Sequence, residues 1–173
     1  MYTVCDTGFP ENAEIFCISF KEDGHNAPIE NGRIIKALEG DNSDLGTGKY
    51  PTSNDSISDL ALVYSPEWSP ARRRKRYDEF RTEAGEVARV VRLRRGMCFA
   101  LSADGFNFNP KLVESGTLVC VDSNGKFSLC EANEQRPIVG RMRAMRNAKG
   151  VRMYSVAIIN DGNPYNNNED LNI

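Results

Sequence analysis

Short apolar runs dominate this 173-residue sequence, and stretches with glycine, proline, asparagine or aspartate bound the first three of them. Runs of this length, rich in β-branched and aromatic residues, are typical of β-strands rather than of core helices. They lie at residues 14–20, 32–40, 58–65, 86–93, 96–103, 116–122, 136–145 and 150–159. The pattern predicts a mostly β fold, a small β-barrel or sandwich.

Two tight turns indicate how the later strands pair. Asn124-Gly125 separates "TLVCVD" from "FSLCE", and this dipeptide supplies the positive φ values that a hairpin turn needs. A second hairpin is expected around Lys149-Gly150. We therefore expect the core barrel in residues 86–159. The side chains expected inside it are Val91, Leu93, Phe99, Leu101, Val119, Phe127, Leu129, Val139 and Val156, with Val87 on the same face as Val91.

The remaining segments are assigned by composition. Residues 1–70 are expected to form an extended, acidic N-terminal β region. Within it, residues 39–56 ("EGDNSDLGTGKYPTSNDS") have almost nothing to bury, which predicts one long mobile loop. Residues 71–85 are expected to be a basic linker or short helix, and residues 160–173 a polar, Asn-rich C-terminal arm.

Charge is distributed unevenly along the chain. Residues 1–70 carry four Lys/Arg against twelve Asp/Glu, a net charge of −8, and the remaining eighteen Lys/Arg and twelve Asp/Glu give residues 71–173 a net charge of +6. Opposite charges on the two halves suit contact between the halves or between copies of the chain. The whole chain, at −2, lacks the basic balance of a dedicated nucleic-acid binder.

No signal peptide or apolar run of membrane-spanning length is recognised, so we expect a protein made in a cytoplasm and without a membrane partner. The five cysteines include no CxxC pair, which argues against a zinc knuckle or a secreted disulfide framework. Cys98, Cys120 and Cys130 lie in apolar stretches and are interpreted as small buried hydrophobic residues. All five thiols are expected to be reduced.

Catalytic and metal-binding patterns are weak. The only histidine, His25, lies in the Gly/Asn-rich stretch "KEDGHNAP", where a solvated loop residue is a better interpretation than a general base. "GDNSDLG" at 40–46 lacks the spacing of a calcium loop, and "GTGK" at 46–49 lacks the rest of a phosphate-binding loop. We expect neither an enzyme nor a cofactor or metal.

A run of five cations, Arg72, Arg73, Arg74, Lys75 and Arg76, follows Trp68. A solvated charged face is the most frequent meaning of such a run. Docking onto an acidic protein surface is the next interpretation, since four of the cations are arginines, whose fork of donors suits carboxylates. Binding of nucleic acid between the flanking aromatic residues is the least favoured interpretation.

The order of several segments resembles the capsid decoration proteins of tailed bacteriophages, also called cement or head-stabilising proteins. The likeness rests on "NGRIIKALEG", "DLALVYSPEW", the Arg-rich strand at 84–94, "VESGTLVCVDSNGKFSL" and "IVGRMRAMRNAKGVRMYSVAII". It is a likeness of order and spacing over about the last two-thirds of the chain.

This resemblance implies a non-enzymatic structural protein that binds the outer surface of a phage capsid and stabilises it. Its expected partners are the major capsid protein and copies of itself, with a trimer as a frequent form in that group. Its expected location is the virion, after synthesis in the host cytoplasm. Trp68 and Arg72–Arg76 are then the expected partner-binding residues, and a nucleic-acid-binding β-barrel module that uses residues 72–76 is the alternative.

Overall fold

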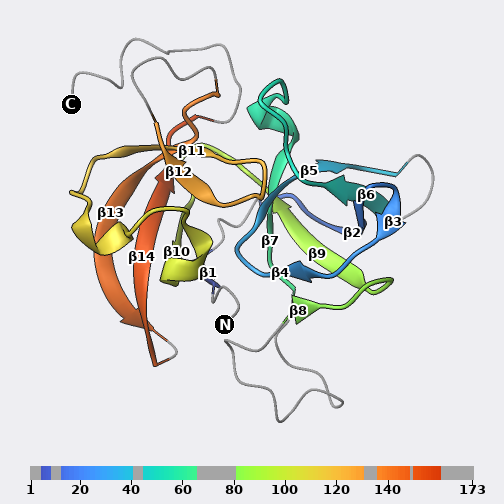
Figure 1. Ribbon diagram of the computed structural model, residues 1–173, viewed down its shortest axis with the longest axis horizontal. Coiled ribbons are helices and arrows are strands. Elements are labelled where there is room, and N and C mark those ends of the chain that lie inside the picture. The colour runs from blue at the N-terminus through green and yellow to red at the C-terminus, as the bar shows by residue number, and fades with distance from the viewer. Residues whose placement is uncertain are drawn as a thin grey trace.

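A computed structural model describes residues 5–8, 13–40, 45–65, 81–130, 136–148 and 150–160. The prediction of a mostly β fold with a small barrel is confirmed, because 51% of the described residues are in strands, 7% are helical, and five strands form a closed barrel. Figure 1 shows the barrel beside a second sheet. Short 3-10 turns lie at Ile57–Asp59, Ala103–Gly105 and Pro110–Leu112.

The closed barrel comes from the first part of the chain. Its strands, in spatial order, are β2 (Ile15–Glu22), β6 (Leu45–Lys49), β5 (Ile34–Leu38), β7 (Leu60–Val63) and β9 (Val87–Arg92). Pairing of β2 with β9 closes the ring, and β2 and β6 are the parallel pair within it. Two short additions complete this part, β3 (His25–Asn26) beside β2 and the pair β4 (Ile29–Glu30) with β8 (Arg81–Thr82).

The barrel interior is filled by side chains from every wall. Its buried residues are Ile18, Phe20, Ile29, Ile35, Ala37, Ala61, Val63, Ala88 and Val90. β6 contributes Gly48, at which an added Cβ would lie 2.3 Å from Cδ1 of Ile18 and 2.8 Å from Cδ1 of Ile35. A larger residue at this position would therefore force the side chains of Ile18 and Ile35 to shift within the barrel interior.

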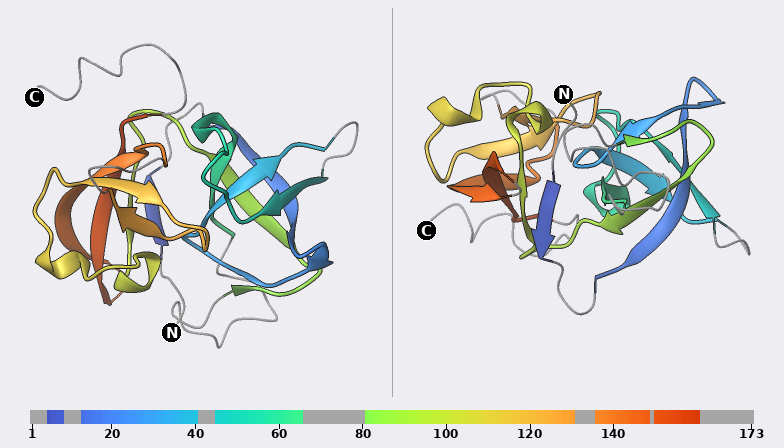
Figure 2. Two further views of the ribbon diagram at one scale, coloured as in Figure 1. Left: turned by 45° about the horizontal axis from the view of Figure 1, so that its top comes forward. Right: turned by 90° about the horizontal axis from the view of Figure 1, so that it is seen from below.

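The second sheet holds six strands in the order β1-β10-β14-β13-β11-β12. They are β1 (Cys5–Gly8), β10 (Cys98–Leu101), β14 (Val151–Ile158), β13 (Gly140–Ala148), β11 (Leu118–Val121) and β12 (Phe127–Leu129). All neighbours in this sheet pair antiparallel. Figure 2 shows this sheet beside the barrel in two further views.

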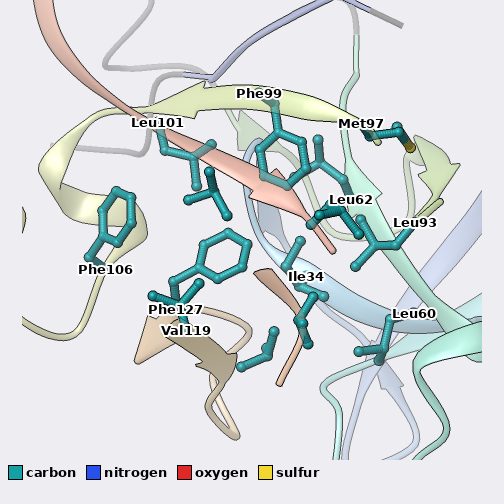
Figure 3. Packing of buried hydrophobic residues seen from close by; sticks show 14 of the residues in the cluster. Ile34, Leu60, Leu62, Leu93, Met97, Phe99, Leu101, Phe106, Val119 and Phe127 are labelled. Atoms are coloured by element: carbon teal, nitrogen blue, oxygen red, sulfur yellow. The ribbon is translucent and has the colours of Figure 1, made fainter. Parts of the chain in front are cut away.

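The two parts share one core. Successive residues of β9 point to opposite sides, so Val90 faces the barrel interior while Val91 faces the second sheet. Ile34 and Leu62 of the barrel belong to the same buried cluster as Phe99 and Phe127 of the sheet, as Figure 3 shows. The rings of Phe99 and Phe127 lie 5.9 Å apart. Because the cluster is continuous, the barrel and the sheet bury each other's apolar faces.

The turn predicted at Asn124-Gly125 also joins the two parts. It is confirmed as a hairpin, but only Gly125 has a positive φ, at 70°, and the backbone of Asp122 bonds that of Lys126, which makes a three-residue loop. The carbonyl of Gly125 accepts a hydrogen bond of 2.8 Å from the amide of Ile34 on β5.

Several expectations are corrected. The closed barrel is not residues 86–159, because β9 pairs with β2 and β7 and the later strands form the open second sheet. The expected loop at 39–56 contains strand β6, whose glycines lie against Ile18 and Ile35. Residues 81–85, expected in a linker or short helix, begin with strand β8, and residues 71–80 lie outside the described chain.

Eight of the nine expected core side chains belong to the buried set, and Leu129 is the exception. Leu129 is 38% exposed because it ends the edge strand β12, beyond the buried cluster. Val87, the first residue of β9, is 54% exposed, since the shared core begins further along that strand at Val91. The C-terminal arm, residues 160–173, lies outside the described chain except for Asn160.

Candidate partner-binding surface

The expected partner-binding residues, Trp68 and Arg72–Arg76, lie outside the described residues. The residues that flank them are described, and they lie side by side. The hydroxyl of Thr82 donates a 3.0 Å hydrogen bond to Oγ of Ser65, across 17 positions of sequence. The described chain on either side of residues 66–80 therefore meets at one corner, where β8 pairs with β4.

Asn31 holds this corner together. Its Nδ2 donates to the carbonyl of Ser65 at 3.0 Å, and its Oδ1 accepts from the amide of Ser65 at 2.7 Å. Oγ of Ser65 also accepts a 3.0 Å bond from the amide of Arg89 on β9. Asn31, Ser65 and Thr82 are all buried, so this network gives the basic segment a fixed base.

A shallow hollow lies next to this base. It has a volume of about 130 Å³, and the described residues around it are Ile15, Tyr64, Arg89, Val90 and Val91. The volume of a ligand pocket is usually about 300–1,000 Å³. This hollow is smaller than that range.

A second cationic surface lies on the hairpin of β13 and β14. β10 pairs with β14 only as far as Leu101↔Tyr154, and β11 pairs with β13 only as far as Leu118↔Arg141. The pairing of β13 with β14 continues to Ala148↔Val151. Residues 143–148 and 150–153, here named the cationic ribbon, therefore extend past the neighbouring strands, as Figure 1 shows.

Arginines occupy both faces of the cationic ribbon. Arg146 is opposite Met153, and the next pair along the ladder, Asn147 and Arg152, points to the other face. A β-bulge between Met142 and Met145 places a further arginine, Arg143, where the strand bends. Arg143, Arg146 and Arg152 are exposed, and Met145 beside them is 54% exposed.

The segment of sequence that contains the ribbon has a net positive charge. Residues 136–160 contain six Lys/Arg and no Asp or Glu. Cations of the barrel form ion pairs within it, such as Arg33 with Glu30 at 2.8 Å and Lys36 with Asp55 at 2.5 Å. Burial alone raises the pKa of Asp55, but hydrogen bonds from Lys36 and Thr52 lower that pKa by more, so it lies below 3.8.

Ion pairs also hold the junction between the barrel and the second sheet. Glu14, just before β2, accepts from Arg94 at 2.6 Å and from Arg92 at 3.4 Å. Hydrogen bonding with Glu39 and with these arginines holds the pKa of Glu14 below 4.5, although burial opposes the shift. These arginines are part of the internal structure and are poorer candidates for contact with a partner.

Other sequence candidates are placed as follows. His25 is exposed on β3, at the end of a hairpin. Cys120 is buried as expected and Cys130 is half-buried, but Cys98 is exposed, because its side chain lies at the first position of β10. Among the described residues, no three His, Cys, Asp or Glu side chains gather in a possible metal site. None of the helical turns within those residues has the length and apolarity needed to cross a membrane.

The ribbon and the network at Asn31 were both missed by sequence reasoning. The ribbon has a signal, since "RMRAMRNAKGVR" alternates cations with other residues without any acid. The hydrogen-bond network has no recognisable sequence pattern, because Asn31 and Ser65 are 34 residues apart in sequence. Comparison with known proteins adds no assignment, because no family model and no curated protein matches the chain.

Proposed function

We propose that this chain is a non-enzymatic structural protein that decorates and stabilises a phage capsid by binding its outer surface. The cationic ribbon carries the proposal, because it is an exposed surface of one charge on a firmly packed scaffold. The basic segment Arg72–Arg76 with Trp68 acts as a second contact, joined to the barrel at the corner held by Asn31.

The chemistry of the ribbon favours an acidic protein surface as the partner. Arginine and methionine are both enriched at protein interfaces, whereas lysine is depleted. The exposed cations described on the ribbon are arginines, and Met145 adds apolar area between them. The guanidinium group can bind a carboxylate through two parallel hydrogen bonds.

Many copies compensate for weak individual contacts. An exposed ion pair contributes only about 0.2–1 kcal/mol. A capsid presents the same acidic patch many times, and neighbouring bound copies raise the effective concentration of each contact. The partners are therefore the major capsid protein and sister copies of this chain, with a trimer as the form expected from the resemblance, and the location is the virion after synthesis in the host cytoplasm.

Nucleic acid is the alternative partner, and one observation supports it. A two-stranded β-ribbon fits the major groove of DNA, and arginine is the residue that most often reads guanine there. The net charge of −2 opposes this alternative, because the acidic residues elsewhere on the chain would repel a polyphosphate.

A co-sedimentation assay with purified capsids from which this protein has been removed tests the proposal. We expect Arg143→Glu with Arg152→Glu to abolish binding, and Arg73→Glu with Arg74→Glu and Arg76→Glu to weaken it strongly. The matched control for the first pair is Lys21→Glu with Lys49→Glu, which changes the charge equally at two exposed barrel positions. The control should bind capsids normally, and every variant should keep its thermal unfolding midpoint.

Single-stranded and duplex DNA serve as competing ligands in the same assay. Binding of either by the unmodified protein near physiological salt, with an affinity that falls steeply as salt rises, would favour the nucleic-acid alternative. Equal binding of capsids by the ribbon variant and the control would remove the ribbon from the proposal.

A further inference from the structure

Two thiols lie together in the hairpin of β11 and β12. Cys120 is opposite Ser128 in the ladder, and Cys130 follows the last residue of β12, where its amide bonds the carbonyl of Leu118. The side chains converge from these diagonal positions, and Sγ of Cys120 donates to Sγ of Cys130 at 2.7 Å. This separation is well inside the distance usual for a hydrogen bond between sulfur atoms, so the hairpin brings both sulfurs to one point.

The surroundings of the two thiols differ. Cys120 is 0% exposed, whereas Cys130 is half-buried. Cys130 is therefore the more accessible thiol of the pair, and Cys120 is buried with its sulfur 2.7 Å from that of Cys130. This is the arrangement of an attacking thiol with a resolving thiol behind it. Such a pair favours closure of an internal bond over the accumulation of an adduct, because the second thiol is already in place.

We propose that Cys120 and Cys130 form a site of reversible oxidation that reacts with low-molecular-weight disulfides. The Cys130 thiolate attacks one sulfur of the reagent, whose S–S bond breaks and releases one thiol. The Cys120 thiolate then attacks Cys130 in the mixed disulfide, and the second reagent thiol leaves. The two protein thiols are oxidised to one disulfide, the reagent is reduced to two thiols, and the protein's two thiol protons pass to them.

The product links β11 to the edge strand β12. These strands carry Val119 and Phe127 of the shared core, and the turn between them binds β5 of the barrel through Gly125. The cross-link would therefore tie together the hairpin that joins the two parts of the molecule. This inference is independent of the proposed capsid function, since it concerns only the chemistry of the hairpin.

The test uses the full, reduced chain incubated with oxidised glutathione under anaerobic conditions. Trypsin cleaves after Lys126, between the two cysteines, so peptides containing Cys120 and Cys130 remain joined only through a disulfide. We expect the intact chain to lose the mass of two hydrogen atoms and these two peptides to appear as a linked pair. Cys130→Ser should form no internal disulfide, whereas Cys17→Ser should still form it.

A second measurement separates the folded geometry from simple sequence proximity. The equilibrium between glutathione and the Cys120–Cys130 disulfide is compared for the native chain and for the chain in denaturant. We expect formation of the protein disulfide to be at least tenfold more favourable in the native chain. An equal or lower value, or a stable glutathione adduct at Cys130 without the linked peptides, would overturn the proposal even if a variant failed to fold.

Discussion

At the scale of single residues, Asn31 is a polar side chain that is 1% exposed, and it bonds both the amide and the carbonyl of Ser65. Both backbone groups belong to the last described residue before the basic segment. A buried backbone group that loses its partner costs about 1–3 kcal/mol. One amide side chain therefore satisfies both backbone groups of Ser65 at this corner.

Asn31→Ala should lower the free energy of unfolding by about 2–5 kcal/mol, because two backbone groups of Ser65 lose their partners together. Asn54→Ala, at an exposed position, is the matched control and should change stability by less than about 0.5 kcal/mol. Urea denaturation of both variants measures the difference. Equal effects of the two substitutions would show that the network does not stabilise the corner.

At the scale of elements, two separate features of the β11–β12 turn favour glycine at position 125. Its φ of 70° favours glycine, and an added Cβ would lie 2.3 Å from the carbonyl oxygen of Ile34. Gly150, at the end of the β13–β14 hairpin, has a φ of 73° but nothing within 4 Å of an added Cβ. The two glycines thus differ in their contact with the barrel and not in backbone conformation.

Gly150→Ala should cost about 1–2 kcal/mol, the usual penalty of a left-handed conformation with a side chain. Gly125→Ala should cost more, because the added methyl group must also displace the backbone of Ile34. Thermal unfolding of both variants measures this difference. If the two midpoints fall equally, the turn does not pack against β5 as described.

Most elements could be predicted from sequence, and the exceptions have physical causes. Strands such as 86–93 and 150–159 contain enough β-branched and apolar residues to be recognised alone. Strand β6 could not be predicted, because "LGTGK" contains two glycines and little apolar surface. Its glycines pack against the side chains of Ile18 and Ile35, and these contacts are visible only in the folded chain. The cationic ribbon also depends on tertiary structure. It extends from the sheet because β10 and β11 stop pairing with β14 and β13 before the β13–β14 hairpin ends.

At the scale of the whole molecule, one buried cluster includes residues from both the barrel and the second sheet. The sequence-based prediction placed the barrel too late in the chain, at residues 86–159. The reason is that β9 has apolar residues on both faces, so its pattern suits a strand of the barrel and a strand of the second sheet equally well. Val90 packs inside the barrel and Val91 packs against the sheet. A pattern along one strand does not identify which neighbours will close a ring, because β2 and β9 meet across about 70 residues of chain.

Leu62→Ala tests whether this shared core makes the unfolding cooperative. Leu62 is 0% exposed and belongs to the shared cluster, so the substitution should cost about 2–5 kcal/mol. Hydrogen exchange should then accelerate equally at amides of β2 in the barrel and of β14 in the sheet. Leu112→Ala, at a residue 78% exposed, should leave both rates nearly unchanged. Acceleration in β2 alone would contradict a single cooperative unit.

The most direct test of the proposed function is a quantitative mass-spectrometric inventory of purified, intact virus particles from cells that make this protein. The proposal predicts that the chain is present in a fixed ratio to the major capsid protein, and that lysines of the chain are modified when intact particles are treated with an amine-reactive label that cannot enter them. Absence of the chain from the particles would contradict the proposal, as would its presence only in a form that the label cannot reach.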